Sequence, residues 1–157
     1  MKRALIFALA SAAAVLLFDF SAPARSRRVA FAGDPQVDDR TELDFARRSV
    51  YSELAARRDI GAVIFLGDLV NEKPELLEPS RRILDSLGKP WFCVAGNHDR
   101  DPGKGERGTR AFSAAIGPAD TAFTMNGIRF ILMNNVRTGA RGGYEGGFTR
   151  GQMDWLA

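Results

Sequence analysis

The stretch of sequence that decides the fold is VAGNHD, residues 94–99. The apolar run at residues 91–94 predicts a buried strand that stops at the glycine of this stretch. An amide, an imidazole and a carboxylate follow directly, from Asn97, His98 and Asp99. An amide oxygen can bind a metal ion, and a neighbouring carboxylate can orient an imidazole ring. The stretch is therefore either a polar turn after a strand or one part of a metal site.

Two earlier apolar runs end in the same way, with a glycine and an aspartate. The run at residues 29–33 precedes Asp34, and the run at residues 62–67 precedes Asp68. Strands separated by helical segments, with about thirty residues per repeat, predict a parallel β-α-β-α-β unit. Because parallel strands present their C-terminal ends on one edge, Asp34, Asp68 and Asn97 are expected to project into one crevice. Helix capping by the two aspartates is the alternative interpretation.

Helical periodicity predicts a helix between each pair of these strands. The first is expected to run from Thr41, as its capping residue, to about residue 59. The second is expected over residues 76–87, and Pro79 places its start near Ser80. The first strand is apolar throughout, so it is expected to be covered on both faces.

The pattern changes after residue 100. A short helix is expected at residues 111–116, and the pair NG at residues 126–127 predicts a type I′ hairpin. Residues 137–147 hold five glycines and show no periodicity, which predicts a loop. Thr149 can cap a last helix.

Composition places the chain among globular proteins and allows one domain. Hydrophobic residues make up 45% of the chain and charged residues 26%. The formal net charge of +3 is too small to indicate nucleic-acid binding. Cys93 is the only cysteine, which excludes an intrachain disulfide, and its apolar strand favours an inert buried thiol.

The first 24 residues have the pattern of a signal peptide. Lys2 and Arg3 precede an apolar run at residues 4–18, which is too short for a comfortable membrane span. Small residues before and at Ala24 predict cleavage after that residue, which leaves residues 25–157 as the mature domain with no stable span. The expected location is outside the cytoplasmic membrane, either secreted or periplasmic. An uncleaved N-terminal anchor is the alternative.

Converging strand-end oxygens suggest a definite chemistry. Two carboxylates close together repel one another unless a cation lies between them. A carboxylate shared by two metal ions about 3.5–4 Å apart is the arrangement that activates water for phosphoester cleavage. Hard oxygen ligands suit manganese, magnesium or ferrous ion more than zinc.

Three motifs, in their order and spacing, carry a family resemblance. They are GDPQ at residues 33–36, GDLVN at residues 67–71 and GNHD at residues 96–99, and together they resemble the calcineurin-like metallophosphoesterase family. The stretch QMDWL at residues 152–156 is similar to a helix that follows the middle strands of that family. The resemblance implies an α/β fold in which two mixed sheets form a β-sandwich flanked by helices. It also implies hydrolysis of phosphomonoesters or phosphodiesters, small molecules bound at a site with two divalent metal ions (Mn, Fe, Zn or Mg).

The resemblance also implies roles for individual residues. Asp34 would bind the first metal ion, with Gln36 as a further amide donor, and Asp68 would bridge both ions. Asn97 would bind the second ion. His98 would contact the phosphate or protonate the leaving oxygen, and Asp99 would orient His98.

The chain departs from the family pattern in two ways. The family usually has Asp-x-His where this chain has Asp34, a proline and Gln36. The later histidine and the Gly-His-x-His ligands of the family are absent, since His98 is the only histidine in 157 residues. The expected domain is therefore truncated on its C-terminal side, as a βαβαβ half plus a β-hairpin.

This expectation limits what the chain should do. A truncated domain should lack turnover above background and should self-associate through an uncovered sheet edge at the predicted hairpin. The alternatives to a phosphoesterase are a non-catalytic remnant and an interaction domain that binds an anion or a metal ion.

Overall fold

A computed structural model describes residues 28–101, 108–139 and 143–157 of the chain. The predicted signal peptide, at residues 1–24, lies outside these ranges, as do residues 25–27, residues 102–107 and part of the predicted loop, at residues 140–142. The described residues contain no helix long and apolar enough to cross a membrane.

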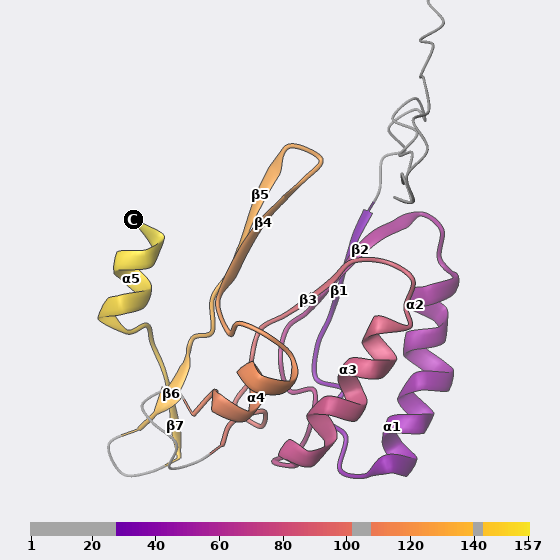
Figure 1. The fold of residues 1–157 in the computed structure, drawn as a ribbon, viewed down its shortest axis with the longest axis horizontal. Coiled ribbons are helices and arrows are strands. Elements are labelled where there is room, and N and C mark those ends of the chain that lie inside the picture. Colours follow the sequence, from indigo (N-terminus) through magenta and orange to yellow (C-terminus); the bar gives the residue numbers. More distant parts are fainter. Residues whose placement is uncertain (1–27, 102–107, 140–142) are drawn as a thin grey trace, which may run out of the picture.

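Three parallel strands form the central sheet, in the spatial order β1-β2-β3 (Figure 1). They are β1 (Arg28–Ala32), β2 (Ile60–Phe65) and β3 (Trp91–Cys93). The register aligns Phe31 with Ile64 and Ile64 with Phe92, so these three side chains share one face. The predicted β-α-β-α-β unit is confirmed, and the three strand ends lie on one edge as expected.

One continuous helical segment connects β1 to β2. It consists of α1 (Arg40–Ala46), the π-helical turn η1 (Arg47–Tyr51) and α2 (Ser52–Ala56). The prediction that Thr41 caps this helix is wrong, because the side chain of Asp39 caps it. Its Oδ1 accepts the backbone N–H groups of Thr41 at 2.7 Å and Glu42 at 2.9 Å.

The second crossover helix starts earlier than predicted. A 3₁₀ turn, η2 (Pro74–Leu76), leads into α3 (Leu77–Asp85), so Ser80 lies inside the helix. Pro79 falls in the first turn of α3, where a backbone N–H has no partner within the helix. The proline therefore does not delay the helix.

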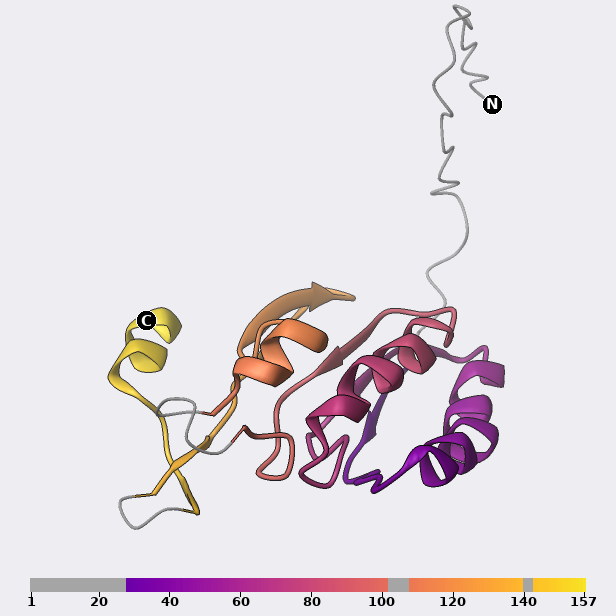
Figure 2. The same ribbon diagram turned by 60° about the horizontal axis from the view of Figure 1, so that its bottom comes forward.

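The helices cover one face of the sheet (Figures 1 and 2). Phe65, near the middle of the core, is fully buried and meets the ring of Tyr51 edge-on at a centroid distance of 5.8 Å. Leu43, Leu77 and Leu84 extend the same apolar cluster from the helices. This core fixes the positions from which the strand-end loops leave the sheet.

An aromatic stack marks the opposite face of the sheet. The ring of Phe92 stacks on Phe123 at 3.5 Å between centroids, and Phe123 stacks on Phe130 at 5.0 Å. Phe123 and Phe130 belong to the antiparallel pair β4 (Thr121–Met125) and β5 (Ile128–Leu132). The hairpin therefore packs over β3 on the face away from the helices, while Phe31 on β1 stays 59% exposed.

The predicted hairpin turn is confirmed by its backbone. Asn126 and Gly127 both have positive φ, at 52° and 77°, as a type I′ turn requires. The described residues form three small sheets rather than a closed sandwich, a mixed α/β arrangement consistent with part of a metallophosphoesterase fold.

The glycine-rich segment is not the simple loop that was predicted. Strands β6 (Val136–Thr138) and β7 (Tyr144–Gly146) pair antiparallel within it. Arg137 Nε donates to Glu145 Oε1 at 2.8 Å across this pair. Both strands have three residues, β6 is half-buried and β7 is exposed, so neither shows an alternation of apolar residues in the sequence.

A polar anchor holds the last helix. Helix α4 (Arg110–Ala115) precedes the hairpin, and α5 (Arg150–Leu156) starts with the expected cap, Thr149. Gln152 completes this capping box and is itself buried. Its Nε2 donates to Asp120 Oδ1 at 2.9 Å and to the carbonyl oxygen of Asn134 at 2.7 Å.

Candidate metal centre

The three strand-end loops are joined by backbone hydrogen bonds. Asp34 N–H donates to the carbonyl of Gly67 at 3.3 Å, and Gln36 N–H donates to the carbonyl of Asp68 at 2.7 Å. The third loop joins the second, where Glu72 N–H donates to the carbonyl of His98 at 3.0 Å. The loops that carry the predicted ligands are therefore neighbours at one edge, as the sequence predicted.

Two glycines make this close approach possible. A Cβ atom at Gly67, where φ is +98°, would lie 2.7 Å from the backbone nitrogen of Gly96. A Cβ atom at Gly96 would lie 2.0 Å from Asp68 Oδ1. No side chain fits at that distance, so these motif glycines bring the second and third loops into contact.

Backbone strain is concentrated in the same loops. Among the described residues, five non-glycine residues have positive φ, and all but the turn residue Asn126 lie in these loops. They are Asp34 at 52°, Gln36 at 44°, Asp68 at 51° and Glu72 at 56°. Such conformations cost about 1–3 kcal/mol each and persist where the surroundings fix them, which is common at functional sites.

Asp68 is a buried carboxylate, only 8% exposed. Its Oδ1 accepts the backbone N–H of His98 at 2.9 Å. Within the described parts of the chain, Asp68 forms no ion pair with a lysine, arginine or histidine. A buried charge is normally paired or bound to a metal ion, so this carboxylate fits a cation.

The candidate ligands on these loops offer oxygen atoms of mixed type. Gln36 uses its amide nitrogen to donate to Asn71 Oδ1 at 3.4 Å, which leaves its carbonyl oxygen for another partner. In the described ranges, no three histidine, cysteine, aspartate or glutamate side chains gather closely enough to form a metal site alone. The amides of Gln36 and Asn97 would have to complete a site with Asp34 and Asp68. This donor set suits a hard divalent cation.

Asp99 is buried beneath the loops, at 1% exposure. Its Oδ2 accepts the N–H of Gly96 at 2.9 Å and its Oδ1 accepts the N–H of Val70 at 3.0 Å. Burial raises the pKa of Asp99 to about 6, although these two backbone hydrogen bonds act in the opposite direction. The carboxylate therefore ties the third loop to the second. That it orients His98 stays a prediction, which these contacts do not support.

The imidazole of His98 is partly exposed on the third strand-end loop. Its side chain is 30% exposed, and its Nδ1 lies 3.9 Å from Glu72 Oε1, longer than a hydrogen bond. Nδ1 is itself buried and has no hydrogen-bond partner within the described residues. The side chain is therefore accessible, while one of its two nitrogens faces the protein.

Two further residues lie at this edge that no sequence motif had indicated. Glu72 contacts His98 through its backbone and lies close to its ring, as above. Arg100 is buried, and its guanidinium donates to the carbonyl of Gly143 at 3.0 Å and to Thr138 Oγ1 at 2.6 Å. Only their place in the sequence could have indicated them, because each residue directly follows one of the three motifs.

Cys93 is confirmed as a buried thiol. Its Sγ lies 3.2 Å from the carbonyl oxygen of Val94, and burial raises the thiol pKa well above its ordinary value. It lies beneath the loops and takes no part in the candidate site.

Comparison with known proteins agrees with this geometry. A comparison with curated proteins finds no match for the chain. A family model described as calcineurin-like phosphoesterase matches residues 27–148, a stretch that includes all three strand-end loops and ends before α5. A match over most of the chain identifies its family: this protein belongs to the calcineurin-like phosphoesterases.

Proposed function

We propose that the strand-end edge binds divalent metal and hydrolyses phosphomonoesters or phosphodiesters of small molecules. The observation that carries the proposal is the buried carboxylate of Asp68, which lacks a cationic partner among the described residues and lies between two interlocked loops. Membership of a family of phosphoester hydrolases supports the reaction class. The metal, its stoichiometry and the substrate belong to the proposal.

Each residue has one part in this proposal. Asp68 would be shared between two ions, Asp34 and Gln36 would serve the first, and Asn97 the second. Bound divalent ions would supply charge stabilisation of the phosphoryl oxygens and a more acidic attacking water. His98 would donate a proton to the leaving oxygen of the ester.

The number of donors sets an expectation for binding. The four side chains of the candidate site offer two carboxylates and two amides, while a divalent ion takes roughly four to six ligands. One ion should therefore bind with modest affinity, and the second position should be mostly empty. This chain alone should show turnover near background.

Titration of the purified chain with Mn²⁺, followed by calorimetry and electron paramagnetic resonance, tests the metal site. In a longer form of the protein that binds two ions, Asp68→Asn should weaken binding more than Asp34→Asn, because the charge of Asp68 would face both ions. Asp154→Asn, on the exposed surface of α5, is the matched control and should leave binding unchanged. Loss of binding with Asp34→Asn but not with Asp68→Asn would show that the bridging assignment is wrong.

The proposed role of His98 as a general acid is tested separately. In a form of the protein that turns over 4-nitrophenyl phosphate esters, His98→Ala should lower kcat by about 10²–10⁴-fold, the usual worth of general acid catalysis. The bound metal content should not change. Loss of metal from His98→Ala would instead make the imidazole a ligand.

A second candidate function is non-catalytic binding of a single ion or of an anion. The lack of a three-residue acidic or histidine cluster in the described residues favours it. Both candidates allow one bound ion in this chain, so turnover separates them. Metal-dependent hydrolysis in a longer form that binds two ions supports the hydrolase, and one ion with no turnover in any form supports the binding module.

We also propose that the protein is exported and begins at Arg25 after cleavage. The short apolar run and the small residues before Ala24 support this location. N-terminal sequencing of secreted material tests it, and recovery of Met1 or Lys2 would favour an anchor.

A further inference from the structure

We propose that Glu72 is the positioning residue for His98. Its carboxylate accepts the Nδ1–H of the imidazole, which turns Nε2 toward the crevice. The contact is inferred from the positions of the two side chains, whose nearest nitrogen and oxygen lie 3.9 Å apart. Its use in catalysis rests on the proposed function, in which Nε2 carries the proton to the leaving oxygen.

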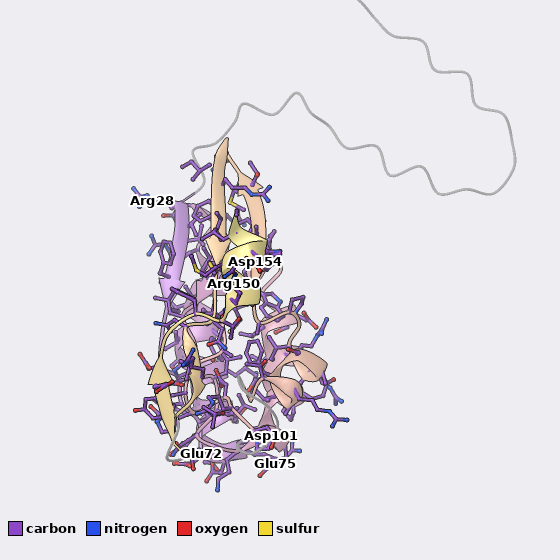
Figure 3. All side chains as sticks on the ribbon, turned by 90° about the vertical axis from the view of Figure 1, so that its left-hand side faces the viewer. Arg28, Glu72, Glu75, Asp101, Arg150 and Asp154 are labelled. Atoms are coloured by element: carbon purple, nitrogen blue, oxygen red, sulfur yellow. The ribbon has the colours of Figure 1, made fainter. Side chains whose placement is uncertain are left out.

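The backbone already joins these two residues. Glu72 N–H donates to the carbonyl of His98 at 3.0 Å, so the backbones of the two residues are held next to one another independently of their side chains. From this position Glu72 Oε1 lies 3.9 Å from His98 Nδ1. Figure 3 shows Glu72 at the end of the molecule opposite Arg28, which is the edge where the strand-end loops gather.

The imidazole supplies the second observation. His98 Nδ1 is buried and has no hydrogen-bond partner among the residues described. A buried ring nitrogen without a partner is unfavourable, and a charged acceptor satisfies an N–H donor best. The Glu72 carboxylate needs to approach by only about 1 Å to reach hydrogen-bond distance. Its side chain is 71% exposed, so a change of rotamer meets little resistance.

The neighbouring candidates are already engaged. Both oxygens of Asp99 accept backbone N–H groups beneath the loops. The amide nitrogen of Asn71 donates to Asp38 Oδ1 at 3.0 Å, and its oxygen accepts from Gln36 at 3.4 Å. Of the carboxylates that the structure describes, Glu72 is the one within 4 Å of the imidazole.

The conformation of Glu72 agrees with a specific use of its side chain. Its φ of 56° lies in the left-handed region, which glycine adopts at lower cost than glutamate. A carboxylate hydrogen-bonded to Nδ1–H would select one tautomer of the neutral ring, in which Nδ1 carries the proton and Nε2 accepts. In the imidazolium form the same contact leaves Nε2–H available to donate a proton.

The single histidine makes the test direct. In the chain labelled with ¹⁵N, the two imidazole nitrogens of His98 give one set of signals, which identify the tautomer in the metal-free protein with a neutral ring. The wild type should be mainly Nδ1-protonated. Glu72→Ala should convert most of the population to the Nε2-protonated form. Glu75→Ala, at an exposed glutamate in the adjacent turn η2, is the matched control and should behave as wild type.

Conservative variants keep the test decisive. Glu72→Gln retains an acceptor oxygen and should preserve part of the tautomer preference, while Glu72→Asp is shorter and should preserve less. If Glu72→Ala does not fold, the tautomer ratio is measured in these two variants instead. An Nε2-protonated wild type, or a tautomer ratio unchanged by every Glu72 variant, would overturn the proposal.

The result is independent of the proposed function. Failure of Mn²⁺ binding would count against the metal site and leave the tautomer result standing. In a form that turns over, Glu72→Ala should lower kcat with KM and metal content unchanged, by less than His98→Ala does. Partial rescue of kcat by Glu72→Asp should follow its partial recovery of the tautomer.

Discussion

Two regions of this molecule are held together by different forces. The first, β1–β3 with α1–α3, surrounds a continuous apolar core in which Phe65 is fully buried. The second, from β4 to α5, is held by an aromatic stack and by polar contacts. In it, Asp120 Oδ1 accepts the N–H of Asn134 at 2.8 Å and the side chain of Gln152 at 2.9 Å. Trp155 on α5 stays 48% exposed.

This difference explains where the candidate site lies. The strand-end loops leave from the well-packed region, so their backbones are fixed by buried strands and by hydrogen bonds between loops. Arg100 joins them to the second region through Thr138 and Gly143. A site on the first region can therefore keep its geometry when the second region loosens.

The largest expected effect is a loss of core packing in the first region. Phe65→Ala should lower the free energy of unfolding by about 3–5 kcal/mol, because it removes a fully buried ring. Phe130→Ala, the same substitution in the half-buried hairpin, should cost less than half of that. Urea denaturation measures both, and equal losses would show that the two regions are equally packed.

A smaller effect is expected where the loops touch. Gly96→Ala should cost about 3 kcal/mol, the upper end for overpacking, because the new Cβ would lie 2.0 Å from Asp68 Oδ1. Mn²⁺ binding should weaken as well. Gly146→Ala is the matched control in the second region, since its Cβ would meet no atom within 4 Å. A stable Gly96→Ala variant with normal metal affinity would contradict this interlock.

Asp99 should make the free energy of unfolding of the first region depend on pH. Burial raises the pKa of its carboxyl from an ordinary value of 3.8 to about 6, so the folded protein holds this proton more tightly than the unfolded chain. Stability from this group is therefore full below about pH 4 and falls by roughly 2–3 kcal/mol as pH rises through 6.

The side chain of Asp99→Asn does not titrate, so this variant should lack the loss of unfolding free energy that the wild type shows as pH rises through 6. Urea denaturation from pH 4 to pH 7 in the presence of a chelator, with wild type and variant compared at each pH, isolates the contribution of this carboxyl. A difference between the two proteins that does not change with pH would contradict the assignment.

The smallest effect is expected at the polar anchor of α5. Gln152→Ala should cost about 1–2 kcal/mol locally, because it leaves Asp120 Oδ1 and the carbonyl of Asn134 without the amide that they share. Faster amide hydrogen exchange confined to α5 would report the change. Met153→Ala on the same helix is the control, and it should alter exchange little because that side chain is largely exposed.

The sequence predicts the structure well where a residue type is compatible with only one local conformation. Strand-end glycines followed by aspartate predicted three parallel strands with loops on one edge, and Asn126 with Gly127 predicted a turn that needs positive φ. The sequence does not decide between two neighbouring residues that can both cap a helix. Asp39 and Thr41 are both capping residues, and only the fold decides which one reaches the N–H groups.

The candidate site was predicted in part for the same reason. The positions of Asp34, Asp68 and Asn97 follow from the strand ends, because parallel strands share an edge. The surroundings of His98 do not follow, because Asp99 adjoins it in sequence yet bonds to Gly96 and Val70. Glu72 comes close through the path of a loop, which no local pattern encodes.

The left-handed backbone of the loops has a consequence for how this edge can change over generations. Asparagine and aspartate tolerate positive φ better than other non-glycine residues, and they differ by one charge. At Asp34 and Asp68, an exchange between the two would alter the charge of the crevice while keeping its shape. Single substitutions of this kind can therefore change the charge of this edge at little cost to its backbone conformation. Gln36 has positive φ without that tolerance, so its backbone conformation favours replacement by glycine, asparagine or aspartate.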